Sequence, residues 1–355
     1  MLRRLGHHAS LQIRRRDVLT SRRNELNTLL SVSSDRGNSH RLLISVVAGK
    51  PVTELYADFE TGAGVDYTAP TAAEQFAAFK KYVEIAEQYE DLMLPGLWNF
   101  PTPDSIPEDL LLDFGDFGKK YGIEAAVPQI WSVAAVGLGD VKKQPTFHVI
   151  QTFPAPLARA FIGQGQSLHV ASNRNQDIYD RVADFLGDDV LYSSVVVSSE
   201  RSSAGVSVVA RDNEGRLTEI RAKRLLISIP PTLANLAPFE LDQDELNVFS
   251  KLKGTKAFAG AVVASTLPLN TSIINVAPSG DWLDYPESNF AQWFKTLDSP
   301  DRYDKVMMFG DSNLDAQSAK KLVERTYNKL VDAGSLEGGS QLEWLQFAEH
   351  GTSNL

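Results

Sequence analysis

Residues 224–231 have the sequence RLLISIPP, a continuous apolar run that is closed by two prolines. A short apolar run bounded by turn residues is typical of a strand buried on both faces of a sheet. Proline donates no backbone hydrogen bond, so the pair at 230–231 predicts that this strand stops abruptly. In open α/β sheets, ligands commonly bind at such strand ends. The segment therefore predicts an α/β fold with a ligand site near residue 230.

The segments on either side of this run predict a small α/β unit followed by a mixed sheet. Upstream, a helix is expected at 175–187, and strands are expected at 190–200, 206–211 and 218–222. Downstream, the pattern predicts a short helix, four strands, a long helix and a last strand. Their ranges are 242–252 for the short helix, 257–265, 271–276, 290–296 and 304–309 for the strands, 314–333 for the long helix and 342–348 for the last strand.

The chain before residue 165 is predicted to be mostly helical. Thr71 and Glu74 have the spacing of a capping box, and apolar residues recur at helical spacing over 72–90. Ser105 and Glu108 repeat the capping-box spacing, and further short helical patterns follow. The order expected along the whole chain is helices, then an α/β piece, then a sheet with helices.

Composition places the chain among ordinary folded proteins, because 43% of its 355 residues are apolar and 23% are charged. The chain has no cysteine, which excludes disulfide scaffolds, thiol nucleophiles and thiolate metal sites. It has no run of about 18 apolar residues, so no membrane span is predicted.

Charge is distributed unevenly along the chain. Residues 1–41 carry nine arginines and three acidic residues, a net charge of +6, whereas the whole chain has −10. The body is therefore acidic, which disfavours nucleic acid as the main partner, since phosphate binding depends on Lys and Arg. We expect the basic leader at 1–41 to lack ordered structure. Its Arg- and Ser-rich composition is typical of an organelle transit peptide, and a solvated tail is the alternative.

Residue spacing predicts no catalytic set and no metal site. The G-x-G pairs at 62/64, 137/139 and 163/165 do not continue to the third glycine of a dinucleotide loop, so we interpret them as turns. The six histidines lack the short spacing of metal ligands. The five tryptophans are interpreted as core and rim packing.

The segment 309–313, FGDSN, is similar to the nucleophile block of GDS-type esterases. A serine needs a positioned base to act as a nucleophile, and no Asp-x-x-His follows Ser312. We therefore interpret Asp311 and Ser312 as a turn and a helix cap, and leave a serine esterase as a minor alternative.

Three segments resemble the flavin-containing amine oxidase superfamily: 186–190 (LGDDV), 195–197 (VVV) and 225–233 (LLISIPPTL). Four others are similar, more narrowly, to the fungal FAD-dependent oxidoreductases within it, a branch that includes cyclopiazonate dehydrogenase-like proteins. These are 56–62 (YADFETG), 66–70 (DYTAP), 94–101 (LPGLWNFP) and 114–117 (FGDF). The resemblance runs from about residue 56 to 350.

The resemblance implies an α/β (mixed α+β), FAD/NAD(P)-binding amine-oxidase-like fold of two domains, here incomplete. Residues 166–236 would be the central segment of the FAD-binding domain. The substrate domain would combine a helical part at 56–165 with a mixed-sheet part at 237–345. In the family, a valine in the strand after LGDDV contacts the adenine end of FAD through its backbone. By position this valine is Val196. Because Val195 and Val197 are its neighbours, the assignment is open by one residue in either direction. The alternative is that Val196 is only a sheet residue.

Two hypotheses for the function follow from the resemblance. The first is an FAD-dependent oxidoreductase that transfers a hydride from a C–N or C–C bond of a small amine or secondary-metabolite substrate to flavin, with reoxidation by O2. The second is a truncated, non-catalytic remnant that acts as a binding domain or has no function. The second hypothesis is motivated by two family segments that are not recognised in this sequence. They are the G-x-G-x-x-G unit with which the family opens and the flavin-contact segment with which it closes. The substrate, the oligomeric state and the compartment are not predicted.

Overall fold

The computed structural model describes residues 44–45, 53–94, 96–135, 140–165, 169–170, 172, 174–252, 254–263, 271–286, 290–296, 304–337 and 342–354. The leader predicted at 1–41 and the glycines at 137 and 139 lie outside the described residues. The described chain separates into two compact units. The first comprises 44–45 and 169–252, and the second comprises 53–165 and 254–354. Each unit is described by itself.

The first unit is built on a three-stranded antiparallel sheet. Its strands lie in the order β4 (Val195–Ser202), β5 (Gly205–Arg211) and β6 (Leu217–Ala222). The two-residue strands β1 (Ile44–Ser45) and β3 (His169–Val170) pair separately. The helices of this unit are α9 (Gln176–Leu186), η7 (Gly187–Asp189), α10 (Leu233–Leu236), η8 (Ala237–Phe239) and α11 (Gln243–Phe249). The predicted helices at 175–187 and 242–252 and the predicted strands at 206–211 and 218–222 are confirmed. The strand predicted at 190–200 begins only at Val195.

The strand predicted at 224–229 is wrong. These residues form neither a helix nor a strand, and Leu226 is 84% exposed. Exposed and half-buried positions alternate along the segment, as in an extended backbone. A strand also needs a neighbouring strand to complete its hydrogen bonds, and no strand among the described residues pairs with this segment. The apolar run alone therefore does not make a buried strand here.

The second unit starts with the short strand β2 (Thr53–Ala57) and continues as a helical layer to residue 161. α2 (Ala72–Ala86) begins at the predicted capping box. The Glu74 N–H donates to Thr71 Oγ1 at 3.3 Å, and the Thr71 N–H donates to the Glu74 carboxylate at 2.8 Å. This confirms the helix start predicted at 72.

The capping box predicted at Ser105 and Glu108 does not form. Ser105 ends the one-turn helix η2 (Pro103–Ser105), and α4 (Glu108–Leu111) begins after Pro107 without a side-chain cap. The helix start is therefore set by the proline. The other helices of the layer are η1 (Glu87–Tyr89), α3 (Glu90–Met93), α5 (Phe114–Tyr121), η3 (Glu124–Ala126), α6 (Val127–Ile130), the π-helical turn η4 (Trp131–Ala135), η6 (Val141–Lys143), α7 (Thr146–Thr152) and α8 (Ala155–Phe161).

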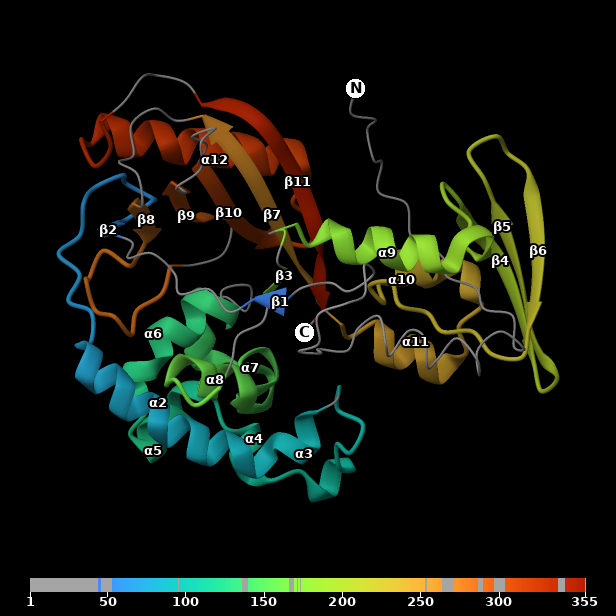
Figure 1. The fold of residues 1–355 in the computed structure, drawn as a ribbon, viewed down its shortest axis with the longest axis horizontal. Helices are drawn as coiled ribbons and strands as arrows, with labels where there is room; N and C mark the ends of the chain where they lie inside the picture. Colours follow the sequence, from blue (N-terminus) through green and yellow to red (C-terminus); the bar gives the residue numbers. More distant parts are fainter. Residues whose placement is uncertain are drawn as a thin grey trace, which may run out of the picture. The chain divides into compact units, whose positions relative to one another are not determined.

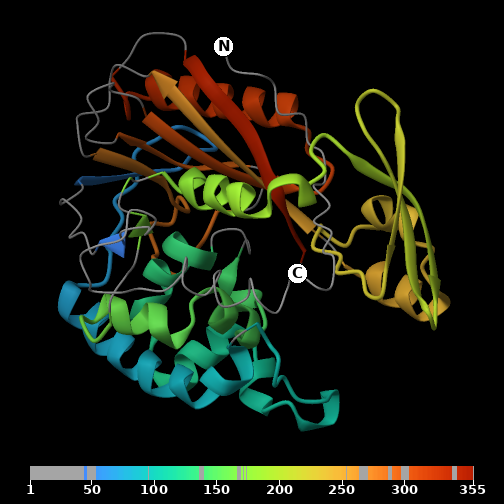
Figure 2. The same ribbon diagram turned by 45° about the vertical axis from the view of Figure 1, so that its right-hand side comes forward.

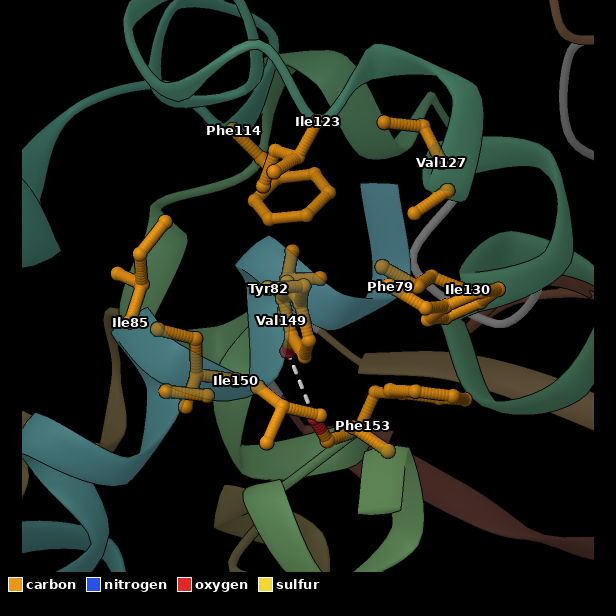
Figure 3. Packing of buried hydrophobic residues seen from close by; sticks show 14 of the residues in the cluster. Phe79, Tyr82, Ile85, Phe114, Ile123, Val127, Ile130, Val149, Ile150 and Phe153 are labelled. Atoms are coloured by element: carbon orange, nitrogen blue, oxygen red, sulfur yellow. Dashed lines mark hydrogen bonds between the residues drawn. The ribbon is translucent and has the colours of Figure 1, made fainter. Parts of the chain in front are cut away.

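The helical layer encloses a core rich in aromatic side chains (Figure 3). Phe114, Ile123 and Phe153 are completely buried in it, and so is Tyr82. The Tyr82 hydroxyl donates a hydrogen bond of 2.6 Å to the backbone carbonyl of Phe153. A buried hydroxyl needs such a partner, because burying it unpaired is costly. This bond fixes α2 against the turn between α7 and α8.

The rest of the second unit is a six-stranded mixed sheet. The strand order is β11-β7-β10-β9-β8-β2, in which β2 runs parallel to β8 and every other neighbouring pair is antiparallel. The bounds are Gly254–Val263 for β7, Thr271–Asn275 for β8, Phe290–Thr296 for β9, Asp304–Asp311 for β10 and Glu343–Asn354 for β11. The predicted strands of this part are confirmed, and so is the mixed α/β fold class.

One face of this sheet is covered by α12 (Ala316–Asp332), which lies along it in both views (Figure 1; Figure 2). Its apolar side packs on Phe258, Val306 and Met308 of the sheet. The cap of α12 is Asp315, whose carboxylate accepts the Ser318 N–H at 2.8 Å. Asp311 and Ser312 were expected to form a turn and a cap. The turn is confirmed, since the Leu314 N–H donates to the Asp311 carbonyl at 2.9 Å and Ser312 lies in the turn, but the cap is wrong because Asp315 caps the helix.

Among the described residues, no helix is both long enough and apolar enough to cross a membrane.

Candidate functional site

Val196, the predicted FAD contact, lies in an edge strand beside a β-bulge. In the β4–β5 ladder Val196 is opposite Ala210, and the next pair is Ser198 with Val209, so Val197 is the extra residue. A bulge leaves backbone groups outside the regular ladder. No strand among the described residues pairs with the other edge of β4. The outer edge of β4 therefore carries backbone N–H and C=O groups that no described strand pairs with, and a backbone contact to adenine needs such groups.

The rest of an FAD site is not assembled by the described residues. A pyrophosphate is normally held by backbone N–H groups at a glycine-rich turn between a strand and a helix. α9, the helix that precedes β4, begins at Asn175 without such a turn and has acidic residues near both ends. The described residues therefore provide an open strand edge at β4 and no glycine-rich turn for a pyrophosphate.

The face of the six-stranded sheet opposite α12 carries small and apolar side chains. Along β10, the buried residues alternate with Met307 and Phe309, which are half-buried on the opposite face. Three residues of β7 in register with this face are alanines, namely Ala257, Ala259 and Ala261, and we call this face of the sheet the alanine face. Side chains this short occupy little space above β7, as a site for an apolar ligand requires. Sequence analysis missed this surface, although alanine at every second position of 257–261 was a signal for it.

Two stacked tyrosines border this face at the β2 end of the sheet. Tyr56 pairs in register with Ile274 of β8, and Ile274 pairs with residue 293 of β9, which in turn pairs with Met307 of β10. Residues paired in this way have side chains on the same face, so Tyr56 lies on the face opposite α12. The Tyr56 and Tyr67 rings stack with centroids 4.4 Å apart. The Tyr56 hydroxyl donates to the Glu54 carboxylate at 2.6 Å. The pair therefore adds a flat aromatic surface to the edge of the alanine face.

Both phenols are poor candidates for a general base. Burial, and then the hydrogen bond to Glu54, raises the pKa of Tyr56. Burial, followed by the nearby charges of Glu54 and Asp281, raises the pKa of Tyr67 to about 12. Both side chains therefore stay neutral near neutral pH, where they act as hydrogen-bond donors and aromatic walls.

The helical layer contains a hollow of about 370 Å³ with a charged lining. Its lysines are already paired: Lys142 lies 3.6 Å from Asp284, and Lys143 lies 3.2 Å from Asp140. The lining residues are Asp113, Gly115, Asp116, Lys119, Glu124, Val127, Asp140, Lys142, Lys143, Leu283 and Asp284. Carboxylates and ammonium groups of this kind suit a charged ligand and do not suit an apolar one.

Histidine and serine chemistry has little support from the described residues. His148 is half-buried, its Nδ1 has no hydrogen-bond partner, and burial lowers its pKa, so it stays neutral. No hydrogen bond joins Ser312 to a histidine in the part of the chain that the structure describes. A search of the same residues finds no group of three or more His, Cys, Asp or Glu side chains that could hold a metal ion.

The interpretation of the tryptophans as core and rim is right for Trp131, which is 6% exposed, and wrong for Trp98, which is 84% exposed. Trp344 is half-buried, and its indole N–H donates to Glu324 at 2.8 Å. The Trp293 side chain lies outside the described residues.

No family model matches the chain. It is 30% identical over 300 residues to beta-cyclopiazonate dehydrogenase of Aspergillus flavus, covering 84% of this chain and 63% of that protein. It is 32% identical over 227 residues to the FAD-dependent oxidoreductase pigF of Monascus ruber, covering 63% of this chain and 46% of that protein. The chain thus spans less than two thirds of the length of these curated relatives.

Among solved structures, the fold is similar to that of the CLA-producing fatty acid isomerase from P. acnes. The TM-score is 0.59 at 15% sequence identity, over 86% of this chain and 70% of that one. This likeness concerns the fold alone. On the sequence similarity, the chain is related to fungal FAD-dependent oxidoreductases, among them beta-cyclopiazonate dehydrogenase.

Proposed function

We propose that this chain is part of an FAD-dependent oxidoreductase that removes a hydride from a small, largely apolar amine or secondary metabolite. The observation that carries the proposal is the 30% identity to beta-cyclopiazonate dehydrogenase over 84% of the chain. FAD supplies the hydride-accepting chemistry in such enzymes, and the protein binds and orients the two reactants.

Each unit has a separate role in this proposal. In the first unit, the backbone of Val196 holds the adenine end of FAD, supported by the bulge at Val197. In the second unit, the alanine face and the Tyr56–Tyr67 stack hold the apolar body of the substrate. We infer that Tyr56 orients the substrate through its aromatic face, because its hydroxyl is already committed to Glu54.

The alternative is a chain of the same family that binds a small molecule without turnover. It is favoured by one observation, that the described residues offer no glycine-rich turn for a pyrophosphate. The two functions differ in whether FAD binds and whether a substrate reduces it.

Anaerobic titration of the FAD-loaded protein with panels of amines and of apolar aromatic metabolites tests the proposal. Substrate should bleach the flavin absorbance, and Ala259→Phe should slow or abolish the bleaching because the larger side chain fills the alanine face. Ala183→Phe, in α9 of the other unit, is the control for adding the same side chain elsewhere. A flavin that binds and is never bleached by either panel would favour the non-catalytic alternative.

A further inference from the structure

Trp98 is exposed to an extent unusual for tryptophan, at 84% of its surface. Tryptophan is mostly buried in proteins, and an exposed ring is typical of a contact site. The Cδ1 and Nε1 atoms of its ring lie 3.8 Å from the position that a Cβ on Gly96 would occupy. The absence of a side chain at Gly96 therefore keeps space beside the indole open.

The turn that carries Trp98, residues 96–100, is anchored from inside. Leu97 and Phe100, on either side of the tryptophan, pack against the helical core. The Leu97 N–H donates to the Met93 carbonyl at 3.2 Å, and the Phe100 N–H donates to the Leu97 carbonyl at 3.1 Å. Leu97 has φ of 62°, a left-handed conformation that is unfavourable for a residue with a side chain. The packing of its neighbours thus holds Trp98 outside the core.

The sequence on either side of this turn is acidic. Residues 82–118 contain nine acidic residues and no Lys or Arg. Four of them are paired with basic residues outside this segment: Glu87 and Glu90 with Arg159, Asp109 with Lys120, and Asp116 with Lys119. Five others are exposed and form no ion pair with the described residues, namely Glu84, Asp91, Asp104, Glu108 and Asp113. Asp91 is adjacent to the turn, because its carbonyl accepts a hydrogen bond of 3.2 Å from the Asn99 side chain.

An exposed indole among unpaired carboxylates matches the chemistry of arginine. The guanidinium group is weakly hydrated, stacks on aromatic faces and pairs with carboxylates. Tryptophan and arginine are also the residues most enriched at the energetic centres of protein interfaces. The body of a second copy of this chain, after residue 41, is a poor occupant, because it is acidic and like charges would meet. An anionic lipid surface is disfavoured for the same reason.

We propose that the Trp98 turn is a docking site for a partner protein segment with closely spaced arginines. One guanidinium stacks on the Trp98 indole, and others pair with carboxylates on either side of the turn, of which Asp91 and Asp104 are the nearest in sequence. The proposal uses neither the alanine face nor Val196, so it does not depend on the proposed oxidoreductase function.

Binding of a hexa-arginine peptide to the full chain, measured by calorimetry, tests the proposal. Trp98→Ala should weaken binding about fivefold or more. Leu226→Ala removes an equally exposed apolar side chain, 84% exposed in the other unit, and should leave the affinity unchanged. A hexa-lysine peptide should bind more weakly than hexa-arginine and should be insensitive to Trp98→Ala, because lysine does not stack in the same way.

A second pair of variants tests the carboxylates. Asp91→Asn with Asp104→Asn should weaken hexa-arginine binding and reduce its dependence on salt. Asp184→Asn with Asp188→Asn removes two exposed acids from the other unit and should do neither. Melting temperatures near that of the wild type show that each variant is folded. Equal affinities of the wild type and Trp98→Ala, or of the two peptides, would overturn the proposal.

Discussion

Arg201 in β4 and Glu245 in α11 form a bidentate ion pair, in which both Nη–Oε distances are 2.7 Å. Arg201 also donates to the carbonyl of Glu240 at 2.6 Å. The Glu245 carboxylate in addition accepts the N–H of Asp242 at 2.9 Å, which is one half of the capping box of α11. One carboxylate therefore ties the helix to the strand that contains Val196 and also caps the helix.

Glu245→Gln should destabilise the protein near neutral pH and have little effect near pH 2. The hydrogen bonds from Arg201, and then the bond from Asp242, lower the pKa of Glu245 from 4.5 to about 2. A carboxyl group with a lowered pKa stabilises the folded state above its unfolded pKa, and this stability is lost as the pH falls through the folded value. The pair is partly exposed, so we expect a loss of about 1 kcal/mol or less.

Urea unfolding of the wild type and Glu245→Gln, repeated from neutral pH down to about pH 2, measures this loss. Glutamine can still serve as the acceptor of the capping box, so the variant mainly removes the charge. Glu200→Gln, at an exposed position of the same strand, is the control. A difference between wild type and Glu245→Gln that stays constant over the whole range would contradict the assignment.

Tyr82→Phe should destabilise the helical layer by about 1–3 kcal/mol, because it leaves the buried Phe153 carbonyl without the Tyr82 hydroxyl. Thermal or urea unfolding measures the change. Tyr179→Phe is the matched control, because Tyr179 is 67% exposed and its hydroxyl can bond to water. Equal stabilities of these two variants would show that the Tyr82 hydrogen bond contributes nothing.

Gly260→Ala should destabilise the protein by about 1–3 kcal/mol through overpacking. A Cβ at Gly260 would lie 2.6 Å from Cζ3 of Trp344 and 2.9 Å from Cγ1 of Val306, on the face covered by α12. At Gly64 the nearest atom to an added Cβ is Oγ of Ser335, at 3.7 Å, so Gly64→Ala should be much milder. A loss at Gly64 as large as that at Gly260 would argue against the described packing.

Local signals predicted much of this fold. The capping box at Thr71 and Glu74 depends on residues three positions apart, and the apolar face of α12 depends on periodicity within one helix. The hairpin turn near Gly215 likewise requires only nearby residues. Such features are set within a few residues of chain, so sequence patterns were sufficient.

The errors arose where the outcome depends on distant partners. The apolar run at 224–229 was expected to be a buried strand, yet a strand depends on neighbouring strands that sequence composition cannot supply. Trp98 was expected in the core or its rim, but Leu97 and Phe100 occupy that core in its place. The alternating alanines at 257–261 are visible in the sequence, but the face that they share with Met307 and Phe309 depends on the register of β7 against β10. Val196 was placed by resemblance, and its contact with FAD stays a prediction.

Val196→Pro should weaken FAD binding, whereas Val196→Ala should leave it nearly unchanged, because the proposed contact is made by the backbone. Thr218→Pro is the matched control, since Thr218 and Val196 lie opposite the same residue, Ala210, on the two outer strands of the sheet. The FAD affinity of each variant is measured by the change in flavin absorbance. If Val196→Ala weakened binding as much as Val196→Pro, the side chain and not the backbone would make the contact.

Titration of the purified chain with FAD, followed by flavin absorbance and thermal unfolding, tests the proposed function most directly. The oxidoreductase function predicts a saturable spectral change with one FAD per chain. It also predicts a stabilisation of about 2.7 kcal/mol when free FAD is a hundredfold above its Kd. An FAD spectrum identical to that of the free cofactor, with no rise in melting temperature at any FAD concentration, would contradict FAD binding by this chain and with it the proposed oxidoreductase activity.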